Sequence, residues 1–141
     1  MSRVLVTPRS LTRSGHPALT RLEEAGFELV FSTPGVQPDE EELLRLVPGC
    51  TGYLAGVEPI SARVIERAED LRVIARNGVG VDNIDLDAAQ RAQVEIVRAA
   101  GANARGVAEL TIALLFALVR AVAFSDAHLK HMSWQRRRGI E

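Results

Sequence analysis

Short apolar runs alternate along the first hundred residues with segments in which apolar side chains recur every three or four positions. The short runs are rich in β-branched residues and predict strands, whereas the wider spacing predicts amphipathic helices. Strands that alternate with helices are typical of a mostly parallel sheet with helices on both faces. The expected strands are Arg3–Thr7, Phe27–Phe31, Gly52–Gly56, Arg72–Ala75 and Val94–Val97, and the expected helices are Pro17–Ala25, Asp39–Val47, Ala62–Ala68 and Leu86–Ala92.

Right-handed crossovers between such strands favour an α/β fold with a flavodoxin-like, doubly wound sheet of order 2-1-3-4-5. Local signals support the helix ends: Gly26 is placed as a C-cap, and Ser61 and Asp85 are placed as N-caps. After the fifth strand the pattern changes to two helices, at about Asn103–Arg120 and Val122–His131. We therefore expect one domain over residues 1–101 and a helical segment over residues 102–141.

The stretch Leu110–Val119 is apolar except for Thr111. It is about half as long as a membrane-spanning helix needs to be, so we expect no membrane association. A helix that is apolar on nearly every face must be covered on every face. We therefore expect Val107–Phe124 to be a helix buried by something outside this domain, such as a second subunit. A central core helix of the same domain is the alternative.

Composition narrows the function classes. Of 141 residues, 47% are hydrophobic and 25% are charged, which is close to a globular average. The 17 Lys and Arg residues nearly balance the 18 Asp and Glu residues, and the resulting net charge of −1 argues against nucleic-acid binding through phosphate contacts. Cys50 is the only cysteine, which excludes an intramolecular disulfide and a cysteine-cluster zinc site. The apolar run near the N-terminus is too short for a secretory signal, so we expect a cytoplasmic protein.

Candidate chemistry concentrates in the loop Arg76–Asn83, between a predicted strand and a predicted helix. In a parallel sheet, ligands bind beyond the carboxyl ends of the strands. Gly78 and Gly80 allow the backbone to approach a ligand and to point successive N–H groups into one concavity, which suits a carboxylate or phosphate beside Arg76. The third glycine of a dinucleotide fingerprint is replaced by Asn83, so we do not interpret this loop as one. A tight connection without a ligand remains the alternative.

Other groups of polar residues give weaker evidence for a functional site. A receiver-type phosphorylation site needs carboxylates directly after the first and third strands, but Thr7 and Gly56 stand there and Glu58 comes later. His128 and His131 lie three residues apart on a helix without further ligand types nearby, so we expect surface residues and no metal site. Cys50 is expected to be a small packing residue.

Two long motifs carry a family resemblance: R-x-G-V-G-V-D-N-I-D begins at Arg76, and N-x-x-x-V-A-E-L-T begins at Asn103. With Gly56–Ile60, they make the chain closely resemble the D-2-hydroxyacid dehydrogenases, and most of all their phosphoglycerate-dehydrogenase-like branch. The resemblance implies a flavodoxin-like substrate domain joined to an NAD-binding Rossmann domain. It also implies hydride transfer between nicotinamide and a 2-hydroxy or 2-oxo acid in the cleft between the two.

The resemblance assigns roles to individual residues. It implies that the loop Gly78, Val79 and Gly80 binds the substrate carboxylate and that Arg76 contacts substrate anions. It places Asn103 near the substrate and the nicotinamide, and Val107 against the nicotinamide. It further implies that the helix within Val107–Phe124 forms a homodimer, which agrees with the expectation from its apolar character.

The departures from the family matter as much. No G-x-G-x-x-G occurs in the sequence, and the family's catalytic arginine, acid and histidine have no counterparts here. Ala55 stands where one branch carries an arginine, which weakens the case for 3-phosphoglycerate as the substrate. We therefore expect the substrate-binding part of an NAD-dependent enzyme, inactive as an isolated chain, with no catalytic residue of its own. The alternative is a non-enzymatic module that binds small anions or dimerises.

Overall fold

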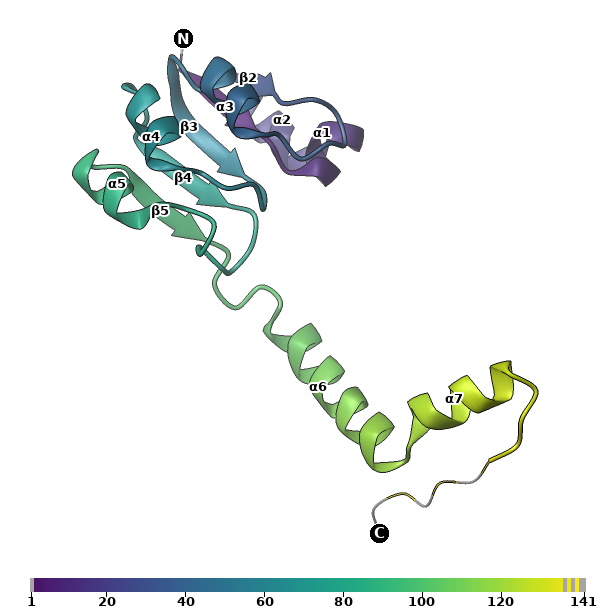
Figure 1. Cartoon of the computed structure of the whole chain (residues 1–141). Helices are drawn as coiled ribbons and strands as arrows, with labels where there is room; N and C mark the ends of the chain where they lie inside the picture. Colours follow the sequence, from purple (N-terminus) through teal and green to yellow (C-terminus); the bar gives the residue numbers. More distant parts are fainter. Residues whose placement is uncertain (1, 136, 138, 140–141) are drawn as a thin grey trace. The chain divides into compact units, whose positions relative to one another are not determined.

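The computed structural model describes residues 2–135, 137 and 139 (Figure 1). The chain divides into two compact units, residues 1–100 and residues 101–141. The first unit contains β1 (Arg3–Val6), α1 (Arg9–Ser14), α2 (Pro17–Glu24), β2 (Glu28–Phe31), α3 (Glu40–Leu46), β3 (Cys50–Ala55), α4 (Ala62–Arg67), β4 (Val73–Arg76), α5 (Leu86–Arg91) and β5 (Glu95–Arg98). The second unit contains α6 (Ala104–Val119) and α7 (Val122–Lys130).

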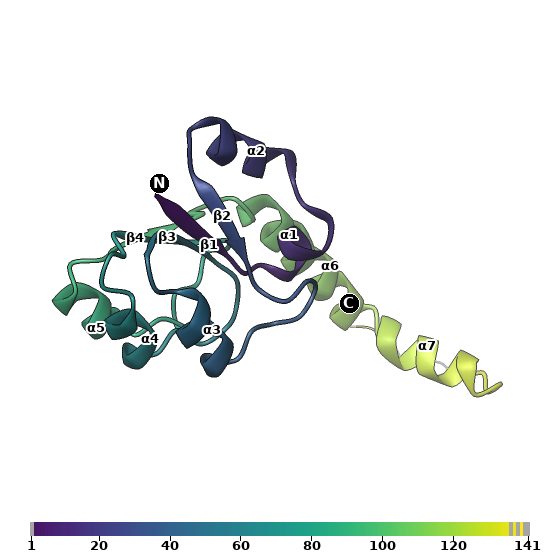
Figure 2. The ribbon, with the colours of Figure 1, turned by 90° about the horizontal axis from the view of Figure 1, so that it is seen from above.

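The five strands form one parallel sheet in the order β2-β1-β3-β4-β5, as the sequence predicts. Helices α3, α4 and α5 cover one face of the sheet, and α1 and α2 lie on the other (Figures 1 and 2). Successive residues of a strand point to opposite faces, so the core has two parts. Leu5, Tyr53 and Ile74 pack beneath α3–α5, whereas Val4 and Val6 pack beneath α1 and α2.

The element boundaries agree with the sequence predictions to within two residues, with one helix missed. That helix is α1, whose only aliphatic residue is Leu11 and which has no fully buried residue, so no periodic signal marks it. Gly26 ends α2 at a positive φ of 86°, and the Asp85 carboxylate caps α5 by accepting the Ala88 N–H at 2.8 Å. Cys50 is fully buried, and burial raises the pKa of its thiol, as suits a packing residue.

Two local predictions hold in part. Ser61 occupies the N-cap position of α4 as predicted, but its hydroxyl donates to the Glu40 carboxylate and not to the helix. The two predicted helices Asn103–Arg120 and Val122–His131 are confirmed, whereas Val107–Phe124 is not one helix: α6 ends at Val119, and Ala121 takes a left-handed conformation with φ of 54°. The hydroxyl of Ser125 then donates to the Ala121 carbonyl at the start of α7.

Helix α6 exposes apolar side chains on all sides within its unit. Seven of them are between 55% and 74% exposed, namely Val107, Leu110, Ile112, Leu114, Leu115, Phe116 and Leu118. Among the described residues, no single helix combines the length and apolarity that a membrane crossing needs; α6 and α7 meet both conditions only together, with a bend of 67° between them. The apolar surface of α6 therefore remains uncovered by the rest of its own unit.

Candidate functional site

The strands of the parallel sheet end at a common edge, so the residues that follow them lie close together. The chain leaves β3 at Gly56 and β4 at Asn77, and the Asn77 N–H donates to the Ala55 carbonyl at 2.8 Å. This hydrogen bond joins the two connecting loops where they begin. The candidate site is the second of these loops, residues 77–83, which runs from β4 toward α5.

Backbone hydrogen bonds fix the first part of this loop and leave the next two amides available. The Gly78 N–H donates to the Arg76 carbonyl at 2.8 Å, and the Gly78 carbonyl accepts the Ala99 N–H at 3.0 Å. Among the hydrogen bonds of residues 2–135, none is donated by the N–H of Val79 or Gly80. Of the three amides that the sequence assigns to a carboxylate, Gly78 is therefore engaged within the protein, and Val79 and Gly80 are available to a ligand.

Arg76 lies across the loop rather than away from it. Its Nη1 donates to the Asn77 carbonyl at 2.7 Å, and its Nε lies 3.4 Å from Asn83 Oδ1. A Cβ atom on Gly78 would collide with the guanidinium group. Gly78 has no positive φ, so a larger residue here would have to move the Arg76 guanidinium from its place over the loop. The half-buried guanidinium is thereby held beside the available amides.

One acidic side chain opposes this positive charge. A Cβ atom on Gly80 would lie 2.8 Å from Asp82 Oδ1, so the Asp82 carboxylate leans over the glycine. Asp82 is exposed, and water screens the repulsion that its charge would exert on an incoming anion. The site therefore combines two backbone donors and one guanidinium with a single screened carboxylate.

Asn83 connects the two loops. Its Nδ2 donates to the Glu58 carbonyl at 2.8 Å, and its own carbonyl accepts the Ile60 N–H at 2.8 Å. The Ile60 carbonyl in turn accepts the Asp85 N–H at 2.9 Å. The Asn83 side chain also faces Arg76, so it bridges Arg76 and the backbone of Glu58. A dinucleotide fingerprint would have its third glycine at this position.

A buried polar cluster lies at the same edge. Thr7, Tyr53 and Glu58 are each at most 1% exposed. Glu58 Oε1 accepts hydrogen bonds from the Thr7 hydroxyl, from the Tyr53 hydroxyl at 2.9 Å and from the Gly56 N–H at 2.9 Å. None of the ion pairs found among the described residues includes Glu58. Burial of a carboxylate is costly, and each such hydrogen bond offsets about 1.5–3 kcal/mol of that cost.

The sequence predicts no such cluster, because Glu58 comes too late in the chain for a receiver site. The available signal is a single acidic residue among the uncharged neighbours Val57, Pro59 and Ile60. The environment acts on Tyr53 in return: burial first, and then the Glu58 carboxylate, raise its pKa well above the ordinary value of 10.0. Tyr53 is therefore a hydrogen-bond donor at any physiological pH.

The remaining predicted site residues belong to the second unit. Asn103 stands at the N-cap position of α6, is exposed, and makes no capping hydrogen bond through its side chain. Val107 lies one turn into α6 and is 55% exposed. Both side chains are thus accessible within their own unit.

Helix α5, which follows the candidate loop, does not fit a dinucleotide cofactor. A pyrophosphate needs the open N-terminus of a helix after a glycine-rich turn. Here α5 follows the Gly78–Gly80 loop, but it has six residues and its first turn is occupied by the Asp85 carboxylate, which would repel a phosphate. No step of a reaction is therefore assigned to a cofactor held by residues 1–100.

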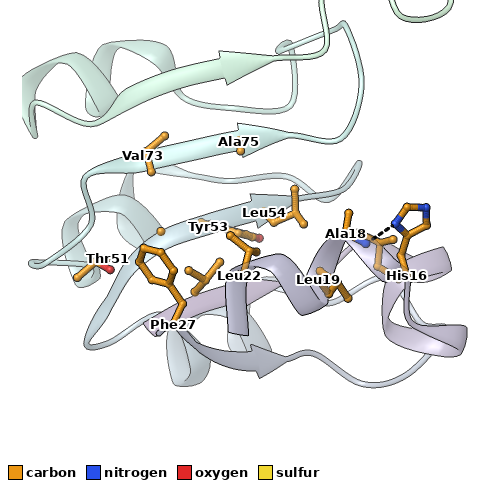
Figure 3. A pocket seen from close by; sticks show the side chains of 13 residues that line it. His16, Ala18, Leu19, Leu22, Phe27, Thr51, Tyr53, Leu54, Val73 and Ala75 are labelled. Atoms are coloured by element: carbon orange, nitrogen blue, oxygen red, sulfur yellow. Dashed lines mark hydrogen bonds between the residues drawn. The ribbon is translucent and has the colours of Figure 1, made fainter. Parts of the chain in front are cut away.

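A hollow of about 410 Å³ lies elsewhere, against the sheet face that carries α1 and α2 (Figure 3). Its walls are almost wholly apolar and include Leu22, Phe27, Leu54, Val73 and Ala75. Parallel sheets are normally covered on both faces, so this hollow marks incomplete coverage over β3 and β4. Its apolar walls suit a side chain rather than a small acid.

These features define a class: a doubly wound parallel α/β domain that presents two available amides and a fixed arginine at its carboxyl edge. Residues 5–135 match the family described as "D-isomer specific 2-hydroxyacid dehydrogenase, catalytic domain". The chain therefore belongs to the D-isomer-specific 2-hydroxyacid dehydrogenase family.

Individual relatives agree with this assignment. A D-3-phosphoglycerate dehydrogenase from Archaeoglobus fulgidus is 39% identical over 127 residues, which are 88% of this chain and 24% of the relative. The crystal structure of a Thermus thermophilus protein is 37% identical with a TM-score of 0.77, over 96% of this chain and 42% of that one. An NAD-dependent formate dehydrogenase from Staphylococcus aureus, solved with NAD, shares the fold: its TM-score is 0.78 and its identity 24%, over 96% of this chain and 43% of that one. The chain thus spans about a quarter of the length of the first relative.

The raised pKa of Tyr53 predicts a pH dependence of stability. The folded state holds the tyrosine proton more tightly than the unfolded chain does. This contribution to the free energy of unfolding is fully present below pH 10.0 and is lost as the pH rises from 10.0 toward the folded pKa, because the unfolded chain ionises first. In the variant Tyr53→Phe, urea unfolding should lack this loss.

Ultraviolet absorbance of tyrosinate checks the same point directly, because Tyr53 is the only tyrosine. We expect tyrosinate to appear together with the loss of native circular dichroism. A tyrosinate titration centred near 10.0 in the folded protein would contradict the buried hydrogen-bonded hydroxyl.

Proposed function

We propose that this chain is the substrate-binding part of an NAD-dependent 2-hydroxyacid dehydrogenase, which transfers hydride between nicotinamide and a 2-hydroxy or 2-oxo acid. The observation that carries the proposal is the pair of available amides, Val79 and Gly80, beside the guanidinium of Arg76. Family membership supports this assignment of the site.

The geometry suits a carboxylate in particular. Two successive N–H groups can donate to one or both oxygens of a planar carboxylate, and charge assistance makes such hydrogen bonds short and strong. Arg76 adds a positive charge that its contacts with Asn77 and Asn83 keep in place. A 2-oxo acid presents its carboxylate and its reactive carbon in adjacent positions, so anchoring the first positions the second.

In the same proposal, residues outside residues 1–100 supply the rest of the reaction. Asn103 would lie near the substrate and the nicotinamide, and Val107 would pack against the nicotinamide. NAD would bind to a separate domain, since α5 after the candidate loop does not fit a dinucleotide. Two dehydrogenases with this fold were solved with NAD bound, a 3-phosphoglycerate dehydrogenase and a formate dehydrogenase, which supports NAD as the cofactor.

A second function is favoured by one observation, the exposed apolar surface of α6. We propose that α6 and the start of α7, within Val107–Phe124, form a homodimer interface. Leu110, Leu114 and Leu118 recur every four residues and form one continuous ridge suited to helix–helix packing. A module that binds small anions or dimerises without catalysis would use the same two features.

Titration with oxalate tests the carboxylate site. In nitrogen-15 NMR spectra, oxalate should shift the amide signals of Val79 and Gly80 more than those of other residues. The variant Arg76→Ala should bind oxalate about tenfold more weakly, because one charge-assisted contact is lost. Arg72→Ala is the matched control: it removes the same charge from an exposed residue before β4 and should leave the affinity unchanged. If both variants bound oxalate equally weakly, the loss of affinity would be explained by net charge and not by a contact with Arg76.

An assay with NADH and a panel of 2-oxo acids tests the proposal that this chain binds the substrate while a separate domain binds NAD. The chain by itself should produce no turnover, because α5 after the candidate loop does not fit a dinucleotide and the Tyr53 and Glu58 side chains at the carboxyl edge are buried away from a ligand. Oxidation of NADH that depends on both the chain and a 2-oxo acid would overturn this assignment.

Analytical ultracentrifugation tests the homodimer. The chain should sediment as a dimer, and Leu114→Glu should shift it to the monomer by placing a charge within the apolar ridge. Glu109→Ala, which removes an exposed carboxylate paired with Arg105 on the same helix, should leave the dimer intact. A chain that is monomeric at high concentration would exclude this interface.

A further inference from the structure

We infer that Glu58 is a positioning residue for the anion site: its buried carboxyl holds the loop from β3 to α4 in the shape that keeps Asn83 and Arg76 in place. Glu58 touches no ligand in this scheme. The inference concerns how the site is built and rests on the proposed function for what the site binds.

The carboxyl fixes its own loop from three directions. Oε1 accepts from Thr7 after β1, from Tyr53 within β3 and from the Gly56 N–H at the start of the turn. The glycine is a condition for this arrangement, because a Cβ atom on Gly56 would lie 2.7 Å from Glu58 Oε2 and 3.2 Å from Pro8 Cα. The backbone of Glu58 therefore has a defined position relative to the ends of β1 and β3.

The fixed backbone of Glu58 in turn holds Asn83 in place. Its carbonyl accepts the side-chain amide of Asn83 at 2.8 Å, and the amide oxygen of Asn83 faces Arg76 Nε at 3.4 Å. Two residues after Glu58, the Ile60 N–H donates to the Asn83 carbonyl at 2.8 Å. Asn83 is thus held by both its backbone and its side chain, and the guanidinium is oriented by a group that Glu58 holds.

A purely structural account of Glu58 predicts something different. A buried carboxyl without a cation is an expensive way to fill space, and an apolar side chain of similar volume often stabilises a core at least as well. Such a replacement would leave the Tyr53 hydroxyl unpaired, while the Thr7 hydroxyl could still donate to the Leu54 carbonyl at 3.3 Å and the Gly56 N–H to the Thr7 hydroxyl at 3.2 Å. On a purely structural account it would act on global stability alone. The positioning role predicts in addition a specific change at Asn83 and Arg76.

The experiment compares variants of the full chain without ligand. Glu58→Leu removes the acceptor, Glu58→Gln keeps an acceptor oxygen at the same place, and Val47→Ala is a destabilising control in the core before β3. Nitrogen-15 NMR reports the side-chain amide of Asn83 and the backbone amides of residues 77–83, and urea unfolding reports stability. We expect Glu58→Leu to shift the Asn83 signals and to speed hydrogen exchange in the loop, Glu58→Gln to restore both largely, and Val47→Ala to change neither.

Thr7→Val gives an independent test if Glu58→Leu does not fold, because it removes one donor and keeps the side-chain shape. It should shift the Asn83 signals in the same direction by a smaller amount. Unchanged Asn83 signals in Glu58→Leu or in Thr7→Val, or an equal shift in Val47→Ala, would overturn the positioning role.

Oxalate then separates this inference from the proposed function. Glu58→Leu should weaken oxalate binding about tenfold, and Val47→Ala should not. If the unmodified chain binds no oxalate, the proposed carboxylate site fails, while the ligand-free signals of Asn83 still decide whether Glu58 positions the loop.

Discussion

The hydrogen bonds of Asn83 tie the loop after β3 to the loop after β4, and the arrangement of the carboxyl edge depends on them. Without the hydrogen bonds of Asn83, the backbone hydrogen bonds that still join the two described segments are those from the Asn77 N–H to the Ala55 carbonyl and from the Asp85 N–H to the Ile60 carbonyl. With the hydrogen bonds of Asn83, the Arg76 guanidinium has a fixed neighbour and the Val79 and Gly80 amides remain unpaired by protein. Two successive backbone donors that no protein atom occupies can be given to an anionic ligand in place of water.

The buried carboxylate of Glu58 helps to hold the loop that contacts Asn83. None of the ion pairs among the described residues includes Glu58. Its carboxylate is stabilised by the Thr7 and Tyr53 hydroxyls and by the Gly56 N–H, which lie at the ends of β1 and β3 or within β3. The same carboxylate contributes to the raised pKa of Tyr53, so the donor that it needs stays protonated. The edge therefore places a negative group inside, where it is hydrogen-bonded, and a positive group outside, where an anion can reach it.

The sequence predicts the sheet order and most elements because apolar periodicity and caps such as Gly26 and Asp85 are local signals. It also locates the Gly78–Gly80 loop and attributes the glycines to ligand approach, which stays a prediction. The lie of the Arg76 and Asp82 side chains over these glycines is a feature that the sequence does not predict. Glu58 escapes prediction because its burial depends on Thr7, 51 residues away. The break at Ala121 is predicted, because the pattern separates the helices Asn103–Arg120 and Val122–His131, although no glycine or proline marks the turn.

A crystal structure of the chain grown with oxalate tests the central claim most directly. The account predicts one carboxylate of oxalate within hydrogen-bonding distance of both the Val79 and the Gly80 N–H, with the Arg76 guanidinium beside it and the Asn83–Glu58 hydrogen bond unchanged. Oxalate bound elsewhere, or these two amides donating to protein atoms, would contradict it.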